Sequence, residues 1–208
     1  APNIAYTLAL LRQRPYLFAT VGEDFSDYRV WLESKGVDTT YARLIPDVYT
    51  ASFFANTDLS NAQIASFYPG AMAYAAQLSL KELDREQASL VVISPNDPEA
   101  MKLYVRECQE LGYPYIYDPS QQIVRLDADD IRQGVGGCQA LFVNDYEFAL
   151  IRKLTGYTAS GILKHARFMV VTRGESGAVI YSQDGEFHIP VVPPEKIADP
   201  TGVGDAFR

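Results

Sequence analysis

From about residue 80 onward, short apolar segments alternate with segments of helical periodicity, and this alternation limits the possible folds more than any other feature. Short buried strands followed by amphipathic helices are typical of a parallel sheet with helices packed on its faces. The expected strands are residues 90–94, 115–117, 140–143 and 168–172, and the expected helices between them are residues 97–111, 128–133 and 148–154. The region is therefore predicted to be an α/β fold.

The rest of the chain gives a weaker pattern. Residues 3–11 and 28–35 have helical spacing of apolar side chains, and residues 16–21 are predicted to form a buried strand. Residues 48–56 are rich in β-branched, aromatic and small side chains, which favours a strand of a small lid sheet. Near the other end, residues 178–181 and 186–192 are predicted to pair as a hairpin across Asp184-Gly185.

Polar side chains follow the expected strands at their carboxyl ends. The segments are residues 118–122, 144–147 and 172–177, and a glycine-rich run at residues 202–205 comes after them. Ligands collect at the carboxyl ends of strands in open parallel sheets, so we expect a binding site at this edge.

The glycine-rich run is part of residues 199–207, which read Asp-Pro-Thr-Gly-Val-Gly-Asp-Ala-Phe. Glycines let an anion approach backbone N–H groups, and a helix N-terminus adds unpaired N–H donors with a partial positive charge. Asp205 would lie beside this cradle, where its carboxylate can take a proton from an attacking hydroxyl. That is the layout of a phosphotransferase without a P-loop. Asp-Pro and Gly-x-Gly also occur in ordinary turns, so the spacing alone leaves both interpretations open.

Composition and motif searches exclude several other classes of function. A net charge of −8 with no run of Lys or Arg argues against nucleic acid or an anionic membrane surface as a partner. No apolar run reaches the length of a membrane helix, and two cysteines, Cys108 and Cys138, favour a reducing cytoplasm. The chain has no G-x-x-x-x-G-K-[ST], G-x-S-x-G or His/Cys metal motif.

The run D-x-T-G-x-G-D-x-F resembles the C-terminal signature of the ribokinase-like (PfkB) sugar and nucleoside kinases. The sequence departs from the commonest version at Pro200 and Val203, and it keeps both glycines and Asp205. The resemblance implies a three-layer αβα sandwich with a central, mostly parallel sheet and a small β lid. Residues 1–208 would form one such domain, incomplete at both ends, with lid elements roughly within residues 40–60.

Two further family motifs occur at the expected strand ends. Asn144 and Glu147 are similar to the family's N-x-x-E motif, which implies contacts to magnesium through water near the phosphates. Thr172 and Gly174 are similar to its T-x-G turn, which implies contacts to nucleotide phosphate. The alternative for Glu147 is a helix-capping or solvated acid.

Residues 63–72, 118–122 and 199–208 look like the corresponding segments of bacterial adenosine kinases. This likeness implies that Asn3 contacts the ribose, that Phe53 and Phe67 flank the purine, and that Gln121 and Gln122 contact the nucleoside. Aromatic rings stack on a purine without hydrogen bonds, whereas a bare sugar requires mostly hydroxyl partners. The alternative for the two phenylalanines is core packing. Residues 67–70 are predicted to form a loop.

The resemblance implies ATP-dependent phosphorylation of the 5′-hydroxyl of adenosine. Asp205 would be the base, and the backbone of Gly202, Val203 and Gly204 would be the anion hole. Asp199 and Thr201 would hold a monovalent cation such as K⁺ in addition to Mg²⁺. The alternatives are a kinase of a free sugar such as ribose or fructose, and a non-catalytic regulatory protein on the same fold. A cytoplasmic homodimer is the expected assembly.

Overall fold

A computed structural model describes residues 1–58, 63–84, 86, 88–193, 195 and 202–207 of the chain. The chain divides into a first unit, Ala1–Leu78 with Thr201–Arg208, and a second unit, Ser79–Pro200. Each unit is described by itself. That residues 1–208 form a single kinase domain stays a prediction.

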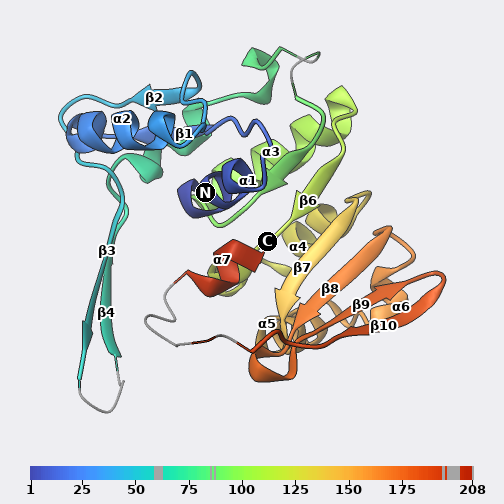
Figure 1. Ribbon diagram of the computed structural model, residues 1–208. Helices are drawn as coiled ribbons and strands as arrows, with labels where there is room; N and C mark the ends of the chain where they lie inside the picture. Colours follow the sequence, from blue (N-terminus) through green and yellow to red (C-terminus); the bar gives the residue numbers. More distant parts are fainter. Residues whose placement is uncertain (59–62, 85, 87, 194, 196–201, 208) are drawn as a thin grey trace. The chain divides into compact units, whose positions relative to one another are not determined.

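The second unit contains a six-stranded sheet with the order β10-β9-β8-β7-β6-β5 (Figure 1). The strands β5 to β8 run parallel, and β9 and β10 complete the sheet as an antiparallel hairpin. The predictions of a mostly parallel sheet and of a terminal hairpin are confirmed. The strands are β5 (Val91–Ile93), β6 (Tyr115–Tyr117), β7 (Ala140–Asn144), β8 (Phe168–Thr172), β9 (Ala178–Ser182) and β10 (Gly185–Ile189).

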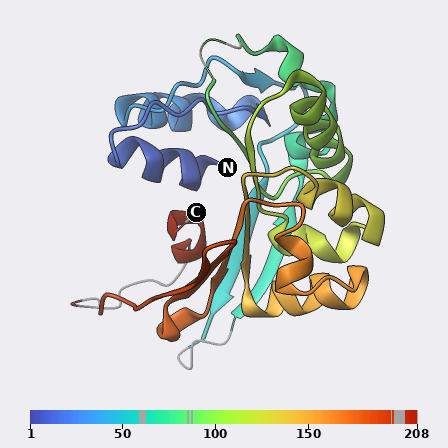
Figure 2. The same cartoon turned by 90° about the vertical axis from the view of Figure 1, so that its right-hand side faces the viewer.

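The helices of the second unit connect neighbouring parallel strands. Right-handed crossovers that all step in the same direction place their helices on one face of the sheet, as Figure 2 shows. Local caps fix both ends of the first of these helices. At its start, the Asp97 carboxylate accepts hydrogen bonds from two N–H groups of the first turn, and at its end Gly112 has a left-handed φ of 71°. The helices are α3 (Pro98–Leu111), α4 (Ala128–Val135), α5 (Asp145–Thr155) and α6 (Ala159–Ile162).

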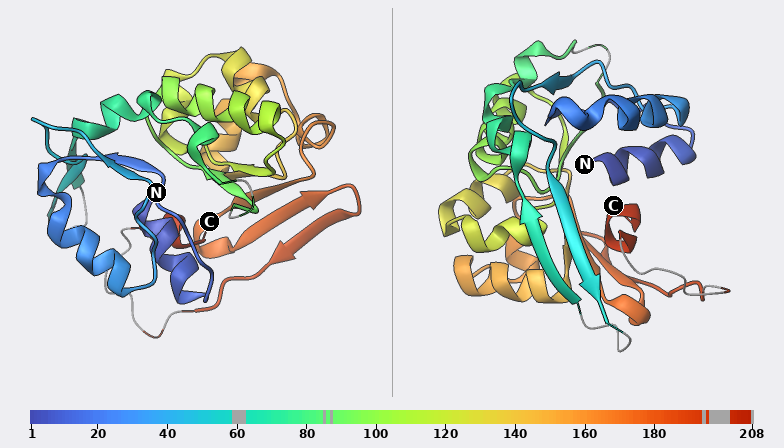
Figure 3. Two further views of the ribbon diagram at one scale, coloured as in Figure 1. Left: turned by 90° about the horizontal axis from the view of Figure 1, so that it is seen from above. Right: turned by 90° about the vertical axis from the view of Figure 1, so that its left-hand side faces the viewer.

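The first unit has a small core between two helices and two short parallel strands. Leu17, Val21, Leu32 and Val37 are all almost fully buried in this core. The elements are α1 (Pro2–Leu10), β1 (Ala19–Val21), α2 (Ser26–Ser34) and β2 (Ala42–Leu44). The short helix α7 (Val203–Phe207), shown in red in Figure 3, packs against α1.

A two-stranded antiparallel hairpin, β3 (Ser52–Thr57) and β4 (Gln63–Tyr68), extends from the first unit (Figure 1). The strand expected at residues 48–56 is thus present, although it begins later. The prediction of a loop at residues 67–70 is wrong for Phe67 and Tyr68, which belong to β4. Phe67 pairs with Phe53 across the two strands, and such cross-strand aromatic pairs stabilise strand structure.

The base of this hairpin is fixed by close backbone packing and by one carboxylate. A Cβ at Gly22 would lie 2.3 Å from the backbone carbon of Tyr49, so only glycine fits there. The Asp24 Oδ1 atom accepts hydrogen bonds from the backbone N–H and the hydroxyl of Thr50, both at 2.7 Å. On the other side of the hairpin, the Ala71 N–H donates to the Tyr49 carbonyl at 2.9 Å.

Among the described residues, no helix combines the length and the apolar character required to cross a lipid bilayer.

Candidate active site

Expected ligand-contacting residues of the second unit meet at the carboxyl ends of its parallel strands. Asn144 ends β7, Thr172 ends β8, and the two residues are direct partners in the register of this strand pair. The loop after β6 joins the same edge, because the Ser120 hydroxyl donates a hydrogen bond to Glu147 Oε1 at 3.1 Å. The structure therefore brings these segments together.

Asn144 and Glu147 form a reciprocal helix cap. The Asn144 side chain accepts a hydrogen bond from the Glu147 N–H at 2.7 Å, and Glu147 Oε2 accepts one from the Asn144 N–H at 2.8 Å. Glu147 is only 6% exposed. The N-x-x-E spacing is thus a capping box at the start of α5. The capping alternative is present in the structure, and the magnesium role stays a prediction.

The two expected glutamine contacts have different environments. Both belong to a 3₁₀ helix, Ser120–Arg125, but Gln121 is exposed and Gln122 is buried. Among the described residues, Gln122 Oε1 has no hydrogen-bond donor. A buried unsatisfied acceptor is costly, so a ligand N–H or a water at this position would be favoured.

In the turn after β8, the backbone at Gly174 and the side chain of Arg173 are exposed. Gly174 has a left-handed φ of 53° and is exposed, and the Arg173 N–H donates to the Gly177 carbonyl at 2.8 Å. The Arg173 guanidinium donates to the Tyr181 hydroxyl at 3.0 Å. The sequence pattern does not indicate a role for Arg173, although this residue lies between the two residues of the T-x-G motif.

In the first unit, the ends of the chain supply a direct contact between two expected site residues. Asn3 Nδ2 donates a hydrogen bond to Asp205 Oδ2 at 2.8 Å. Asn3 is in the first turn of α1 and is exposed, and Asp205 is in α7 and is partly exposed. The two residues are 202 positions apart, so no sequence spacing could have predicted the contact.

The expected anion cradle lies at the start of α7. Gly202 has a left-handed φ of 78°, and its carbonyl accepts the Ala206 N–H at 2.9 Å. The first N–H groups of a helix have no acceptor one turn earlier. Val203 and Gly204 are both exposed. The expected cation ligands Asp199 and Thr201 lie outside the described residues.

Phe53 and Phe67 lie on the same face of the β3–β4 hairpin. Their exposed fractions are 56% and 52%, so core packing does not explain either ring. Phe54 lies on the opposite face, since successive side chains of a strand alternate.

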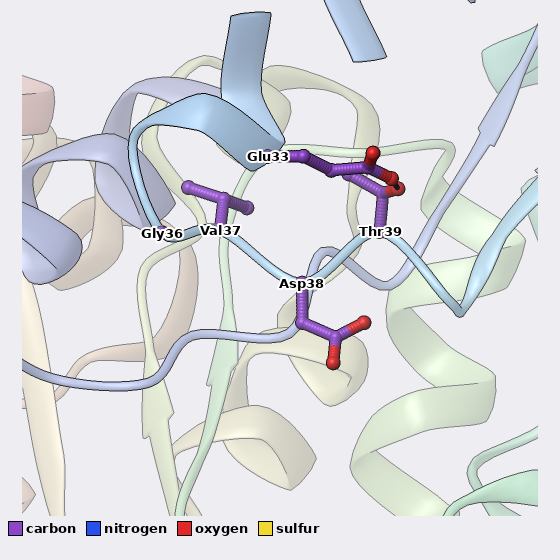
Figure 4. A pocket seen from close by; sticks show the side chains of 5 residues that line it. All are labelled: Glu33, Gly36, Val37, Asp38 and Thr39. Carbon is purple, nitrogen blue, oxygen red and sulfur yellow. Dashed lines mark hydrogen bonds between the residues drawn. The ribbon is translucent and has the colours of Figure 1, made fainter. Parts of the chain in front are cut away.

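A pocket of the first unit contains none of the expected site residues. Figure 4 shows its lining, which consists of Glu33, Gly36, Val37, Asp38 and Thr39. The Thr39 hydroxyl donates to the Glu33 carboxylate. With two carboxylates and no cation in its lining, this pocket is unsuited to a phosphate group.

The described residues contain no group of three or more His, Cys, Asp or Glu side chains that could hold a metal ion. Glu147 offers one buried carboxylate whose two oxygens each accept a hydrogen bond. Such a carboxylate is better suited to contact a Mg²⁺ ion through the waters that the ion retains than to bind the ion directly.

The chain matches the family model "pfkB family carbohydrate kinase" over residues 1–208. The chain belongs to the pfkB family. As a pfkB-family kinase, it is a phosphotransferase that acts on a hydroxyl group, with a ribokinase-like α/β fold.

Several relatives of this pfkB chain are nucleoside kinases. The nucleoside kinase of Methanothermobacter thermautotrophicus is 32% identical over 100% of this chain and 68% of its own length. The Burkholderia thailandensis nucleoside kinase in complex with inosine has a TM-score of 0.95 at 35% identity, over 100% of this chain and 69% of that one. A second structure of that enzyme is in complex with ADP-inosine. The structure of the Methanocaldococcus jannaschii nucleoside kinase has a TM-score of 0.92 at 26% identity, and the match covers 99% of this chain and 68% of that one.

Proposed function

We propose that this pfkB-family protein transfers the γ-phosphoryl group of ATP to the 5′-hydroxyl of a purine nucleoside, with adenosine as the expected substrate and inosine as the first alternative. Asp205 takes the hydroxyl proton, and the backbone N–H groups of Gly202, Val203 and Gly204 bind the transferred group. With a loose transition state, positioning and charge stabilisation supply most of the catalysis.

The observation that carries this proposal is the exposed aromatic pair Phe53 and Phe67. Two phenyl rings on one hairpin face, both more than half exposed, provide an apolar surface that a flat base covers. A free sugar has no flat base that could stack on these two rings. The similarity of the whole chain to the B. thailandensis nucleoside kinase in complex with inosine supports the same substrate class.

The nucleotide contacts are assigned to Asn144, Thr172 and Gly174, and nucleoside contacts to Asn3, Gln121 and Gln122. Glu147 would hold Mg²⁺ through water, and Asp199 and Thr201 would hold K⁺ where a monovalent cation is required. Bound Mg²⁺ neutralises phosphate charge as the phosphoryl group is transferred.

A sugar kinase is the second candidate. The deoxyribokinase of Salmonella typhimurium is 26% identical over 99% of this chain and 70% of its own length. A sugar kinase would retain the anion hole and Asp205, and it would not need the aromatic pair.

The test compares Phe53→Ala with Phe54→Ala, a matched substitution on the opposite face of the same strand. Stacking on one ring contributes about 1–3 kcal/mol per base. Phe53→Ala should therefore raise KM for adenosine and inosine by roughly 10-fold or more, with KM for ATP unchanged. Phe54→Ala should leave both values near those of the parent enzyme. Equal effects of the two substitutions, or activity on ribose that exceeds activity on nucleosides, would contradict the proposal.

A further inference from the structure

The hydrogen bond between Asn3 and Asp205 gives Asn3 a task that differs from binding the ribose. Its Nδ2 atom is 2.8 Å from Asp205 Oδ2, a good N–H···O distance. Gly202, whose left-handed φ of 78° favours glycine, immediately precedes α7, and α7 packs against α1.

A carboxylate that accepts a proton must present one oxygen to the substrate in a defined direction. The Asp side chain rotates about two bonds, so one hydrogen bond to one oxygen greatly reduces the orientations of the other. The Asn3 amide N–H donates and a carboxylate oxygen accepts, so the contact fixes which Asp205 oxygen faces Asn3.

We propose that Asn3 is a positioning residue for Asp205: the Asn3 amide holds Oδ2 and thereby fixes the orientation of the carboxylate that receives the hydroxyl proton. This rests on the proposed function, in which Asp205 is the base. The hydroxyl proton passes to the Asp205 carboxylate, and the hydroxyl oxygen forms a bond to the γ-phosphorus of ATP. The bond between that phosphorus and the bridging oxygen breaks, and ADP leaves with the electron pair.

The amide of Asn3 has enough hydrogen-bonding groups for a ribose contact as well. It carries two N–H donors and one carbonyl acceptor, and one donor is directed at Asp205. A ribose hydroxyl bound by the second donor or the carbonyl would orient the same amide that orients the base. Substrate binding and base orientation would then be coupled through one side chain.

The test uses Asn3→Ala and the isosteric Asn3→Asp in the full-length protein, each alone and combined with Asp205→Asn. Asn3→Asp retains the shape of the side chain and an acceptor for ribose but lacks the donor. Both single variants should lower kcat by about 10- to 100-fold, the scale of a displaced catalytic group. Asn3→Asp retains an acceptor for the ribose and should leave KM and calorimetric Kd for inosine within about threefold, whereas Asn3→Ala also loses the ribose contact and should raise both by up to about 10-fold. In the Asp205→Asn background, neither substitution should change kcat more than about twofold. Gln13→Ala, which truncates an exposed amide just beyond α1, is the control and should retain full activity.

Three results would overturn the proposal. A higher KM with unchanged kcat would make Asn3 a ribose contact only. Full activity of Asn3→Asp would show that the donor is not required, and multiplied losses in the double variants would show that Asn3 acts independently of Asp205. Near-normal turnover of Asp205→Asn alone is a separate result, because it would remove the base assignment of the proposed function and the positioning role with it. Thermal unfolding of each variant verifies that the fold is retained.

Discussion

The Glu147 carboxylate holds two segments of the second unit with its two oxygens. One oxygen accepts from the Asn144 N–H and the other from the Ser120 hydroxyl, and the side chain is 6% exposed. Its capping role is visible in the structure, whereas its magnesium role is proposed. The two roles can be separated, because a glutamine retains the shape and the capping geometry and lacks the charge.

We therefore expect Glu147→Gln to leave the free energy of unfolding within about 0.5 kcal/mol of the parent value and to raise the Mg²⁺ concentration required for half-maximal activity. Glu147→Ala removes both hydrogen bonds and should cost about 1–3 kcal/mol of stability. Urea denaturation and Mg²⁺ titration of activity measure the two effects. An unchanged Mg²⁺ requirement of the Glu147→Gln enzyme would show that Glu147 caps the helix and does not contribute to Mg²⁺ binding.

The positions of single candidate residues could be predicted from the sequence better than their contacts could. Asn144, Thr172 and Gly174 could be placed at strand ends because each lies at or just beyond the end of an apolar segment of strand length. The Ser120 contact to Glu147 and the Asn3 contact to Asp205 come from segments that meet only after folding. The N-x-x-E spacing was readable as a capping box from the sequence alone.

Among the elements, the β3–β4 hairpin combines exposed aromatic side chains with a fixed base. Residues 63–68 lack a strict apolar alternation, so β4 had little sequence signal of its own. Its strand conformation follows from pairing with β3. By contrast, α3 was predicted almost to the residue, since its caps are local.

The Asp24 contact makes the base of the hairpin sensitive to acid. The hydrogen bond from the Thr50 N–H, and then that from its hydroxyl, hold the pKa of Asp24 below its ordinary value of about 3.9. A group whose pKa is lowered by folding stabilises the protein above its unfolded pKa, and this contribution is lost as the pH falls through the folded value. We expect the melting temperature of the parent protein to fall more steeply below about pH 4 than that of Asp24→Asn. Calorimetric melting between pH 7 and pH 3 measures the difference, and parallel curves would show that the contact contributes nothing.

For the whole molecule, the order of strands and helices was the most predictable property. Strands of a parallel sheet are buried on both faces and therefore appear as short apolar runs, which is why β5 to β8 were found within a few residues. The division into two units and the position of the hairpin strands depend on contacts between distant segments. Substrate class was inferred from the resemblance and from the aromatic pair, since fold alone does not determine it.

The proposed nucleoside kinase activity is tested most directly by the product that the full-length protein forms from ATP and Mg²⁺ with adenosine, inosine, ribose or deoxyribose. Mass spectrometry and phosphorus NMR identify the product and the phosphorylated hydroxyl. We expect nucleoside 5′-monophosphate and one ADP per product, with kcat/KM for the best purine nucleoside at least about 10-fold above that for either sugar. Phosphorylation of the free sugars alone, or no ATP-dependent product from any of the four acceptors, would contradict the proposed activity.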